Sequence, residues 1–401
     1  MLIISPIFNA MVRNKSSVVL IIFQIALTLA IVSNAAFIIQ ERISDMQRDT
    51  GIPESQVVNF TMFFFDEDVD VIKQLELDAQ QLKKMPGVIE ATAVNQVPLS
   101  GSGDSWMVRN QLESEGAITV GSANFRGGSS LINMLGQKVS RGRNFRPEEV
   151  TYLVNGNEMP KVTIITQALA ETLFPEEDAL GKTVYIMNNP LQVIGIVDKM
   201  QGPWVHSTLV EYNMFIAMLR PSKFTRFGVL VEKDQVDNVM ANVQDYLLAL
   251  ENRRVVNTPS TIAQQKASSY QNDRLMTNML FIIIVVLAFI TALGIAGMTI
   301  FNVNRRQKQI GTRRALGASK GDILSYFMTE SAIIAAIGIS LGVVLALVLN
   351  NYLMTFFDSN ALSFSYILMT ILGIVVVVGF SVLLPARKAS LISPAIATRS
   401  V

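Results

Sequence analysis

Long apolar stretches free of charged residues dominate the hydrophobic pattern of this chain. They cover residues 17–39, 276–301, 331–350 and 364–384. A helix needs about 20 apolar residues to cross a bilayer, so we predict four transmembrane helices, the last ending at Pro385. The first stretch is longer than the apolar core of a cleaved signal peptide, which has about 7–15 residues. We therefore expect the first helix to be retained.

The segment between the first two apolar stretches, residues 40–275, has the mixed pattern of an α+β domain. Alternating and β-branched runs predict strands, and helical spacing predicts helices between them. We expect the flanks 40–48 and 263–275 to extend the adjoining spans as stalk helices, and a lobe to be inserted at about 98–160. The predicted strands are 57–65, 88–97, 117–126, 161–165, 183–187, 191–197, 212–218 and 226–231, and the predicted helices are 69–85, 167–174 and 235–252.

Composition supports an integral membrane protein and excludes several other classes. Only 16% of the residues are charged, against about 25% in soluble domains, and the mean hydropathy is +0.38. A net charge of +1 gives no overall attraction to nucleic acid. The chain has no cysteine, which excludes disulfides, thiolate metal sites and a cysteine nucleophile, and its single histidine, His206, is too few for a histidine metal site.

Charged residues are segregated along the chain, and this predicts its orientation. Basic residues flank the apolar stretches in 1–16, in 302–330 and in the tail 385–401, whereas acidic residues outnumber basic ones in 40–275. Because basic loops stay in the cytoplasm, we expect both termini and 302–330 to be cytoplasmic. The domain 40–275 and the short loop 351–363 are then outside.

No sequence motif of enzyme chemistry is found. There is no G-x-x-x-x-G-K-[ST] phosphate loop, G-x-S-x-G elbow or H-E-x-x-H pair. We expect no catalytic residue, no metal site and no cofactor in this chain. We also expect His206 to pack or lie on the surface, and the run Arg141, Arg143 and Arg146 to form a solvated loop. Glu330, an acid at membrane depth, is a functional candidate by default, but we favour an ion pair with a neighbouring arginine.

The most informative segment is 302–330, NVNRRQKQIGTRRALGASKGDILSYFMTE. It begins as a polar continuation of the second span. We expect a turn near Gly311 and a capped break at Gly317-Ala318-Ser319. A loop that served only to set topology would not need this order of glycines.

This segment resembles the MacB/FtsX-like permease family, the membrane subunits of type VII ABC transporters, whose pattern is R-x-x-E-I-G-x-R-R-A-L-G-A-S-x-x-D-I. Gln309 departs from the usual acid, and Glu330 matches an acid that is common there. The tail Pro385-Ala386-Arg387-Lys388-Ala389-Ser390 with Ser393-Pro394-Ala395, and residues 162–183, are also similar to the family. The matching residues are Arg306, Ile310, Gly311, Arg313, Arg314, Ala315, Leu316, Gly317, Ala318, Ser319, Asp322 and Ile323.

The resemblance implies that two permeases, identical or paralogous, pair in the bilayer and that each docks on a cytoplasmic ATPase that holds ATP and magnesium. Only about 16 residues precede the first span, so we expect the ATPase to be a separate chain. We expect residues 309–319, from Gln309 to Ser319, to form its docking element. Ile310, Ala315 and Leu316 would fill an apolar groove on the ATPase, and Arg313 and Arg314 would pair with acids at its rim.

The resemblance also implies movement of the external domain of a bacterial inner-membrane protein, with several possible outputs. Export of a peptide or small molecule from the periplasm, through an adaptor and an outer-membrane channel, fits the large external domain. Signalling to cell-wall hydrolases, as in FtsX-like relatives, and lipoprotein extraction are the alternatives within the family. A scaffold without an ATPase is the alternative outside it. The substrate is not readable from the sequence.

Overall fold

The computed structural model describes residues 15–66, 69–112, 116–153, 159–207, 210–357 and 360–392. They divide into a helical unit, made of the chain up to Met46 and from Asp273 on, and an α/β unit, Gln47–Asn272. Residues 1–14 of the N-terminal flank, Asp358 in the loop 351–363, and the tail from 393 on, which includes Ser393-Pro394-Ala395, lie outside the described residues.

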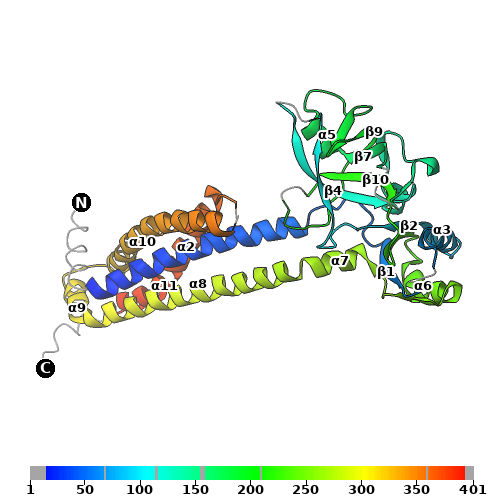
Figure 1. The fold of residues 1–401 in the computed structure, drawn as a ribbon. Coiled ribbons are helices and arrows are strands. Elements are labelled where there is room, and N and C mark those ends of the chain that lie inside the picture. The colour runs from blue at the N-terminus through cyan, green and yellow to red at the C-terminus, as the bar shows by residue number, and fades with distance from the viewer. Residues whose placement is uncertain are drawn as a thin grey trace. The chain divides into compact units, whose positions relative to one another are not determined.

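The helical unit contains four long helices, which Figure 1 shows running side by side. All four are long and apolar enough to cross a membrane, with hydropathies of 2.3 to 3.0 in their most apolar windows. The four predicted spans lie within these helices. The helices of this unit are α2 (Lys15–Met46), α8 (Gln271–Arg305), α9 (Gln307–Ala315), α10 (Lys320–Phe357) and α11 (Phe364–Ser390).

The helix that contains the last predicted span continues beyond Pro385, which lies inside α11. A proline inside a helix costs about 3 kcal/mol through a lost hydrogen bond and a steric clash. Val382, Ala386 and Ala389, which flank it, are completely buried in the bundle. Packing of the turns on both sides therefore offsets the cost of the proline.

Glycines let α2 and α10 approach closely. A Cβ atom at Gly338 would lie 2.9 Å from Ile25 Cβ, and one at Gly342 would lie 2.9 Å from Leu29 Cβ and 3.0 Å from the Ala26 carbonyl oxygen. In a bilayer, such small residues allow the backbone contact that holds helices together. We call this contact the α2–α10 seam.

Helix α8 is attached along a narrower strip. Only 11% of its most apolar window is buried, against 44% for α2. The Thr28 and Thr291 hydroxyls hydrogen-bond at 2.9 Å, and Gly294 makes room for Gln24, whose Oε1 would lie 2.6 Å from an added Cβ. Most of the apolar surface of α8 therefore faces away from the rest of the chain.

The α/β unit is built on one 13-stranded sheet in the order β12-β1-β11-β2-β4-β3-β8-β9-β7-β10-β6, in which β13 pairs with β1, β5 pairs with β9 and β4 also pairs with β10. This last pairing closes β4, β3, β8, β9, β7 and β10 into a strand ring. The strands are β1 (Val57–Phe64), β2 (Val88–Val94), β3 (Ser105–Arg109), β4 (Thr119–Gly127), β5 (Val139–Gly142), β6 (Thr151–Tyr152), β7 (Val162–Thr166), β8 (Thr183–Ile186), β9 (Asn189–Val197), β10 (Asn213–Leu219), β11 (Phe224–Val231), β12 (Arg254–Val256) and β13 (Ser260–Thr261). The helices are α3 (Val71–Leu82), α4 (Leu131–Met134), α5 (Gln167–Leu173), α6 (Val236–Leu250) and α7 (Ile262–Ser269), with a 3₁₀ turn at Pro147–Glu149.

Two hydrophobic cores fill this unit. In the first lobe, which we define as β1, β2, β11, α3 and α6, the rings of Phe60 and Phe227 stack with centroids 6.0 Å apart. The second core belongs to the strand ring and includes Val108, Ile165 and Met214. The stretch 98–160, expected as an inserted lobe, supplies β3 to β6, but the ring that β3 and β4 enter continues to β10 at Leu219.

The predicted extension of the second stalk helix is interrupted. Thr261 caps the start of α7, where its hydroxyl accepts a hydrogen bond from the Gln264 amide at 3.2 Å, and α7 ends at Ser269. Tyr270 separates α7 from α8; it is 1% exposed, and its hydroxyl accepts a hydrogen bond from Gln201 Nε2 at 3.1 Å. The break between the two helices therefore falls at a residue that is buried in the α/β unit. At the other flank, α2 continues to Met46, as expected for 40–48.

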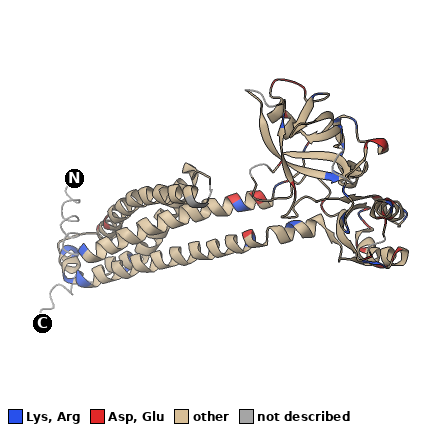
Figure 2. Cartoon of the chain, viewed as in Figure 1, with Lys and Arg blue, Asp and Glu red and all other residues tan. Residues whose placement is uncertain are grey.

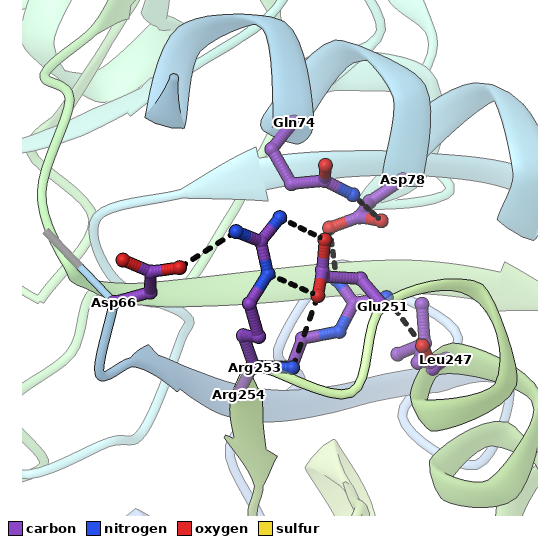
Figure 3. Close-up of polar contacts among 7 residues, drawn as sticks. All are labelled: Asp66, Gln74, Asp78, Leu247, Glu251, Arg253 and Arg254. Carbon is purple, nitrogen blue, oxygen red and sulfur yellow. Dashed lines mark hydrogen bonds and ion pairs between the residues drawn. The ribbon is translucent and has the colours of Figure 1, made fainter. Parts of the chain in front are cut away.

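A buried arginine holds the first lobe together (Figure 3). Arg254 on β12 pairs with Asp78 of α3 and donates to the Leu247 carbonyl of α6. Both charged side chains are at most 1% exposed. Burial raises the pKa of the Asp78 carboxyl, and Arg254 opposes that shift. This contact ties β12 and α6, which are neighbours in sequence, to the distant helix α3.

Candidate functional site: the α9 coupling segment

The segment after α8 forms a short basic helix at one end of the helical unit. Helix α9 has the sequence QKQIGTRRA, with Arg313 and Arg314 in its last turn, where cations favour the helix dipole. Figure 2 shows lysines and arginines gathered at this end, whereas the long helices carry few charges along their middle. This is the charge distribution expected beside a membrane surface.

The structure places the turn before α9 earlier than predicted. We expected it near Gly311, but Gly311 is buried inside the helix, and the break falls at Arg306. Ile310, 4% exposed, packs in one core with Ile323 and Phe327 of α10. Gly311 is thus a buried position within α9, next to the residue that packs on α10.

The predicted break at Gly317-Ala318-Ser319 is confirmed. Gly317 has a φ of +98°, the Ala318 amide donates to the Arg313 carbonyl at 3.0 Å, and the Gly317 amide donates to the Arg314 carbonyl at 3.2 Å. These are the two hydrogen bonds of a Schellman motif. A short, fixed turn therefore follows α9.

The next helix begins with a capping box. The Ser319 hydroxyl accepts from the Asp322 amide at 3.1 Å, and Asp322 Oδ2 accepts from the Ser319 amide at 2.8 Å. Together with the preceding motif, this cap satisfies backbone groups at both helix ends. The connection from α9 to α10 is thus short and fully hydrogen-bonded at these positions.

An ion pair, a hydrogen bond and a ring contact fix α9 and the residue before it on α10. Arg306 Nη1 lies 3.0 Å from Glu330 Oε2, and Arg306 Nη2 lies 3.2 Å from Glu330 Oε1. Arg306 also donates to the Tyr326 hydroxyl at 3.2 Å, and the Arg313 guanidinium lies 4.9 Å from the centre of the Tyr326 ring. The expected pairing of Glu330 with a nearby arginine is therefore present.

The remaining site residues differ in what they present outward. Ile310, expected to enter a groove on the ATPase, instead packs within this chain because α9 folds back on α10. Arg314 Nη1 donates to the Ala318 carbonyl at 2.9 Å. Leu316 is 84% exposed. The other exposed residues of 309–319 are Gln309, Thr312, Arg313, Ala315, Gly317 and Ser319, while Ala318 is half-buried.

Sequence reasoning did not identify Tyr326, nor did it single out Arg306 as the arginine that pairs with Glu330. The signal was available in the helical spacing of Ile323, Phe327 and Glu330, which places them on one face of α10. Within the described residues, no group of acidic or histidine side chains could hold a metal ion.

Comparison with known proteins finds two family domains in this chain. Residues 16–246 match the MacB-like periplasmic core domain, and residues 281–394 match the FtsX-like permease C-terminal domain. Among curated relatives, the macrolide export ATP-binding/permease protein MacB of Neisseria meningitidis (serogroup A / serotype 4A) is 27% identical over 345 residues, 82% of this chain and 50% of that protein. The uncharacterized ABC transporter permease YknZ of Bacillus subtilis is 25% identical over 273 residues, 67% of this chain and 64% of that one. The chain spans about half the length of the MacB relatives it matches.

Two solved structures are similar at low identity. The periplasmic region of MacB from Actinobacillus actinomycetemcomitans matches with a TM-score of 0.35 and 16% identity, covering 56% of this chain and 96% of that one. The extracellular domain of the noncanonic ABC-type transporter YknZ from Gram-positive bacteria matches with a TM-score of 0.31 and 18% identity, covering 50% of this chain and 99% of that one. The match to the MacB-like periplasmic core domain covers more than half of the chain and establishes its family. This protein is therefore a MacB/FtsX-like permease with a MacB-like periplasmic core domain.

Proposed function

We propose that this permease receives energy from a separate cytoplasmic ATPase through the α9 coupling segment, and uses it to move its external domain. The supporting observation is the contrast within that segment. Leu316 is 84% exposed on a fixed turn, while Ile310 and Arg306 anchor the same helix to α10. An exposed leucine on a fixed turn, next to a helix that is anchored on α10, is suited to insert into an apolar pocket of a partner.

Helix α9 is directly connected to α8 before it and to α10 after it, so a force on α9 can reach both helices. Its start follows α8 after a break at Arg306, and its end leads into α10 through four residues. A displacement of α9 by the ATPase would therefore act on both helices. The α/β unit lies between α2 and α8 in sequence, so movement of α8 would act directly on one of its two chain connections.

Orientation and partners follow from the same proposal. The basic end of the helical unit faces the cytoplasm of a bacterial inner membrane, both termini lie on that side, and the α/β unit is outside. A second permease, identical or paralogous, covers part of the apolar face of α8. The driven process is export of a peptide or small molecule from the periplasm, with a periplasmic adaptor and an outer-membrane channel.

The docking role of Leu316 can be tested by co-purification. The permease would be co-expressed in turn with each ABC ATPase of its own genome, and the complex would be purified in detergent. We expect Leu316→Asp to lower the yield of bound ATPase at least tenfold, because loss of a central apolar anchor costs about 2 kcal/mol or more. Lys320→Ala should scarcely change the yield, because charges at the rim contribute less.

A matched control separates docking from folding. Leu112 is 50% exposed in the α/β unit, and Leu112→Asp makes the same chemical change away from α9. Thermal unfolding of each variant would be followed in parallel. If Leu316→Asp folds and keeps its ATPase at the parental yield, the docking site lies elsewhere.

A further inference from the structure

A cleft of about 210 Å³ opens in the α/β unit where the first lobe meets the strand ring. Its walls come from α3, the end of β2, β4, the end of β10 and the start of β11. The sheet register places Arg226 of β11 opposite Val94 of β2, and Val94 opposite Gly127, the neighbour of Arg126 on β4. Two arginines of separate strands are thereby brought to the same cleft.

Three arginines line this cleft: Arg126, Arg220 and Arg226. Arg126 Nη2 is paired with Asp104 Oδ2 at 2.8 Å. No ion pair of Arg220 or Arg226 is found within the described ranges. Positive charge therefore exceeds negative charge among the described side chains at this place.

Arg226 is the most unusual of the three. Its Nε is buried and has no hydrogen-bond partner among the described residues. Burial lowers the pKa of the guanidinium, and no described carboxylate counteracts this. Leaving a donor of a charged group desolvated and unpaired costs free energy. The negative charge of an anion held at the same guanidinium in the cleft would offset part of this cost.

The surroundings of the arginines define what such an anion would look like. The Arg126 amide donates to Asn95 Oδ1 at 2.7 Å, and the Asn95 side-chain amide donates to the Asn124 carbonyl at 2.9 Å, so β4 is fixed beside the cleft. Leu75 and Phe224, the latter 58% exposed, contribute apolar surface to the same walls. The cleft thus combines guanidinium groups with an apolar wall.

We propose that this cleft is a binding site for a small organic anion, whose carboxylate or phosphate group is held by Arg226 with Arg126 and Arg220, and whose apolar part lies against Phe224. Guanidinium groups match the planar oxygens of both anions and bind them through paired hydrogen bonds. The site depends only on the geometry of the α/β unit. It stands whether or not the α9 segment docks an ATPase.

Calorimetric titration of the full chain tests the site, in nanodiscs of zwitterionic lipid at low salt. The probes are phenyl phosphate, benzoate and, as the uncharged counterpart, phenol. We expect saturable binding of at least one anion, with phenol at least tenfold weaker. The tighter of the two anions identifies the acid group.

Variants assign the binding to the arginines. Arg226→Gln should weaken anion binding at least tenfold. Arg226→Lys keeps the charge but loses the paired N–H donors of the guanidinium, and should weaken binding less. Lys161→Gln removes one positive charge from an exposed position that does not line the cleft, and should leave affinity within twofold of the parent. If Arg226→Gln fails to fold in a thermal unfolding control, Arg220→Gln, on an exposed side chain, takes its place. The proposal is overturned if neither anion binds at millimolar concentration, if phenol binds equally well, or if the folded arginine variant binds like the parent.

Discussion

Arg306 and Glu330 form a two-pronged ion pair across the start of α9, with nitrogen–oxygen distances of 3.0 and 3.2 Å. Only 12% of the arginine side chain and 4% of the glutamate side chain are exposed. A pair this deeply buried is costly to break from one side, because the remaining charge is left without a partner.

Breaking this pair from one side should therefore destabilise the helical unit more than removing it altogether. Glu330→Gln should cost about 3 kcal/mol or more, and the double variant Arg306→Gln/Glu330→Gln should cost less than the sum of the two single changes. Thermal unfolding in nanodiscs gives the three values. Additive effects would show that the two side chains are not energetically coupled.

The α2–α10 seam should not tolerate a side chain at its glycines. Gly342→Val would force atoms against Leu29 Cβ and the backbone of Ala26, so we expect a loss of about 1–3 kcal/mol or more from overpacking. Gly297→Ala on α8 is the matched control, since no described atom lies within 4 Å of its added Cβ. The control should be neutral or slightly stabilising because alanine favours helix. Equal melting temperatures for the valine variant and the parent would contradict the close contact.

In the first lobe, the buried partner of Arg254 should matter far more than an exposed ion pair. Asp78→Asn leaves the guanidinium buried without a carboxylate, and we expect a cost of about 3–5 kcal/mol. Asp178→Asn breaks the exposed pair with Arg141, whose side chains are 54% and 44% exposed, and should scarcely change stability. Denaturant unfolding followed by tryptophan fluorescence compares the two. A small effect of Asp78→Asn would mean that the lobe repacks around Arg254.

Acid should remove part of the stability of the first lobe through Glu251. Hydrogen bonds from Arg253 lower the pKa of Glu251 from 4.5 to about 2. A lowered carboxyl pKa means that the folded state favours the charged form. The stabilisation is therefore present above pH 4.5 and is lost as the pH falls toward about 2. The stability difference between the parent and Glu251→Gln should shrink between pH 5 and pH 2.5; a difference that is the same at both pH values would contradict this assignment.

Local patterns in the sequence predicted the helices and strands of this protein well, but they did not predict its long-range contacts. The four spans could be predicted because an uncharged apolar run has few alternatives to a membrane helix, and the strand at 57–65 became β1, Val57–Phe64. The capped break at Gly317 could also be predicted, because its residue types act locally. The helical state of Pro385 and Gly311 could not, because each depends on packing by residues elsewhere in the chain.

The sites formed by distant strands were beyond sequence reasoning for the same reason. Arg254 and Asp78 are 176 positions apart, and nothing near either residue specifies the other. The arginine cleft likewise exists only once β11, β2 and β4 are in register. The prediction of an inserted lobe at 98–160 did not include the whole strand ring. The strand that closes the ring, β10, begins only at Asn213.

Helices α8 and α10 both pack on α2, but to different extents. They therefore differ in how strongly they resist sliding along α2. Moving α10 along α2 would bring larger side chains to the places of Gly338 and Gly342. These side chains would clash with α2, so the α2–α10 seam resists sliding. Moving α8 a short way along α2 would break the Thr28–Thr291 hydrogen bond and the Arg42–Asp273 ion pair, and would shift Gln24 from the gap at Gly294. It would disturb little close packing, because only 11% of the most apolar window of α8 is buried. The unit therefore resists shear more strongly along the α10 contact than along the α8 contact. If α9 receives a force, as proposed above, the expected result is an axial displacement of α8.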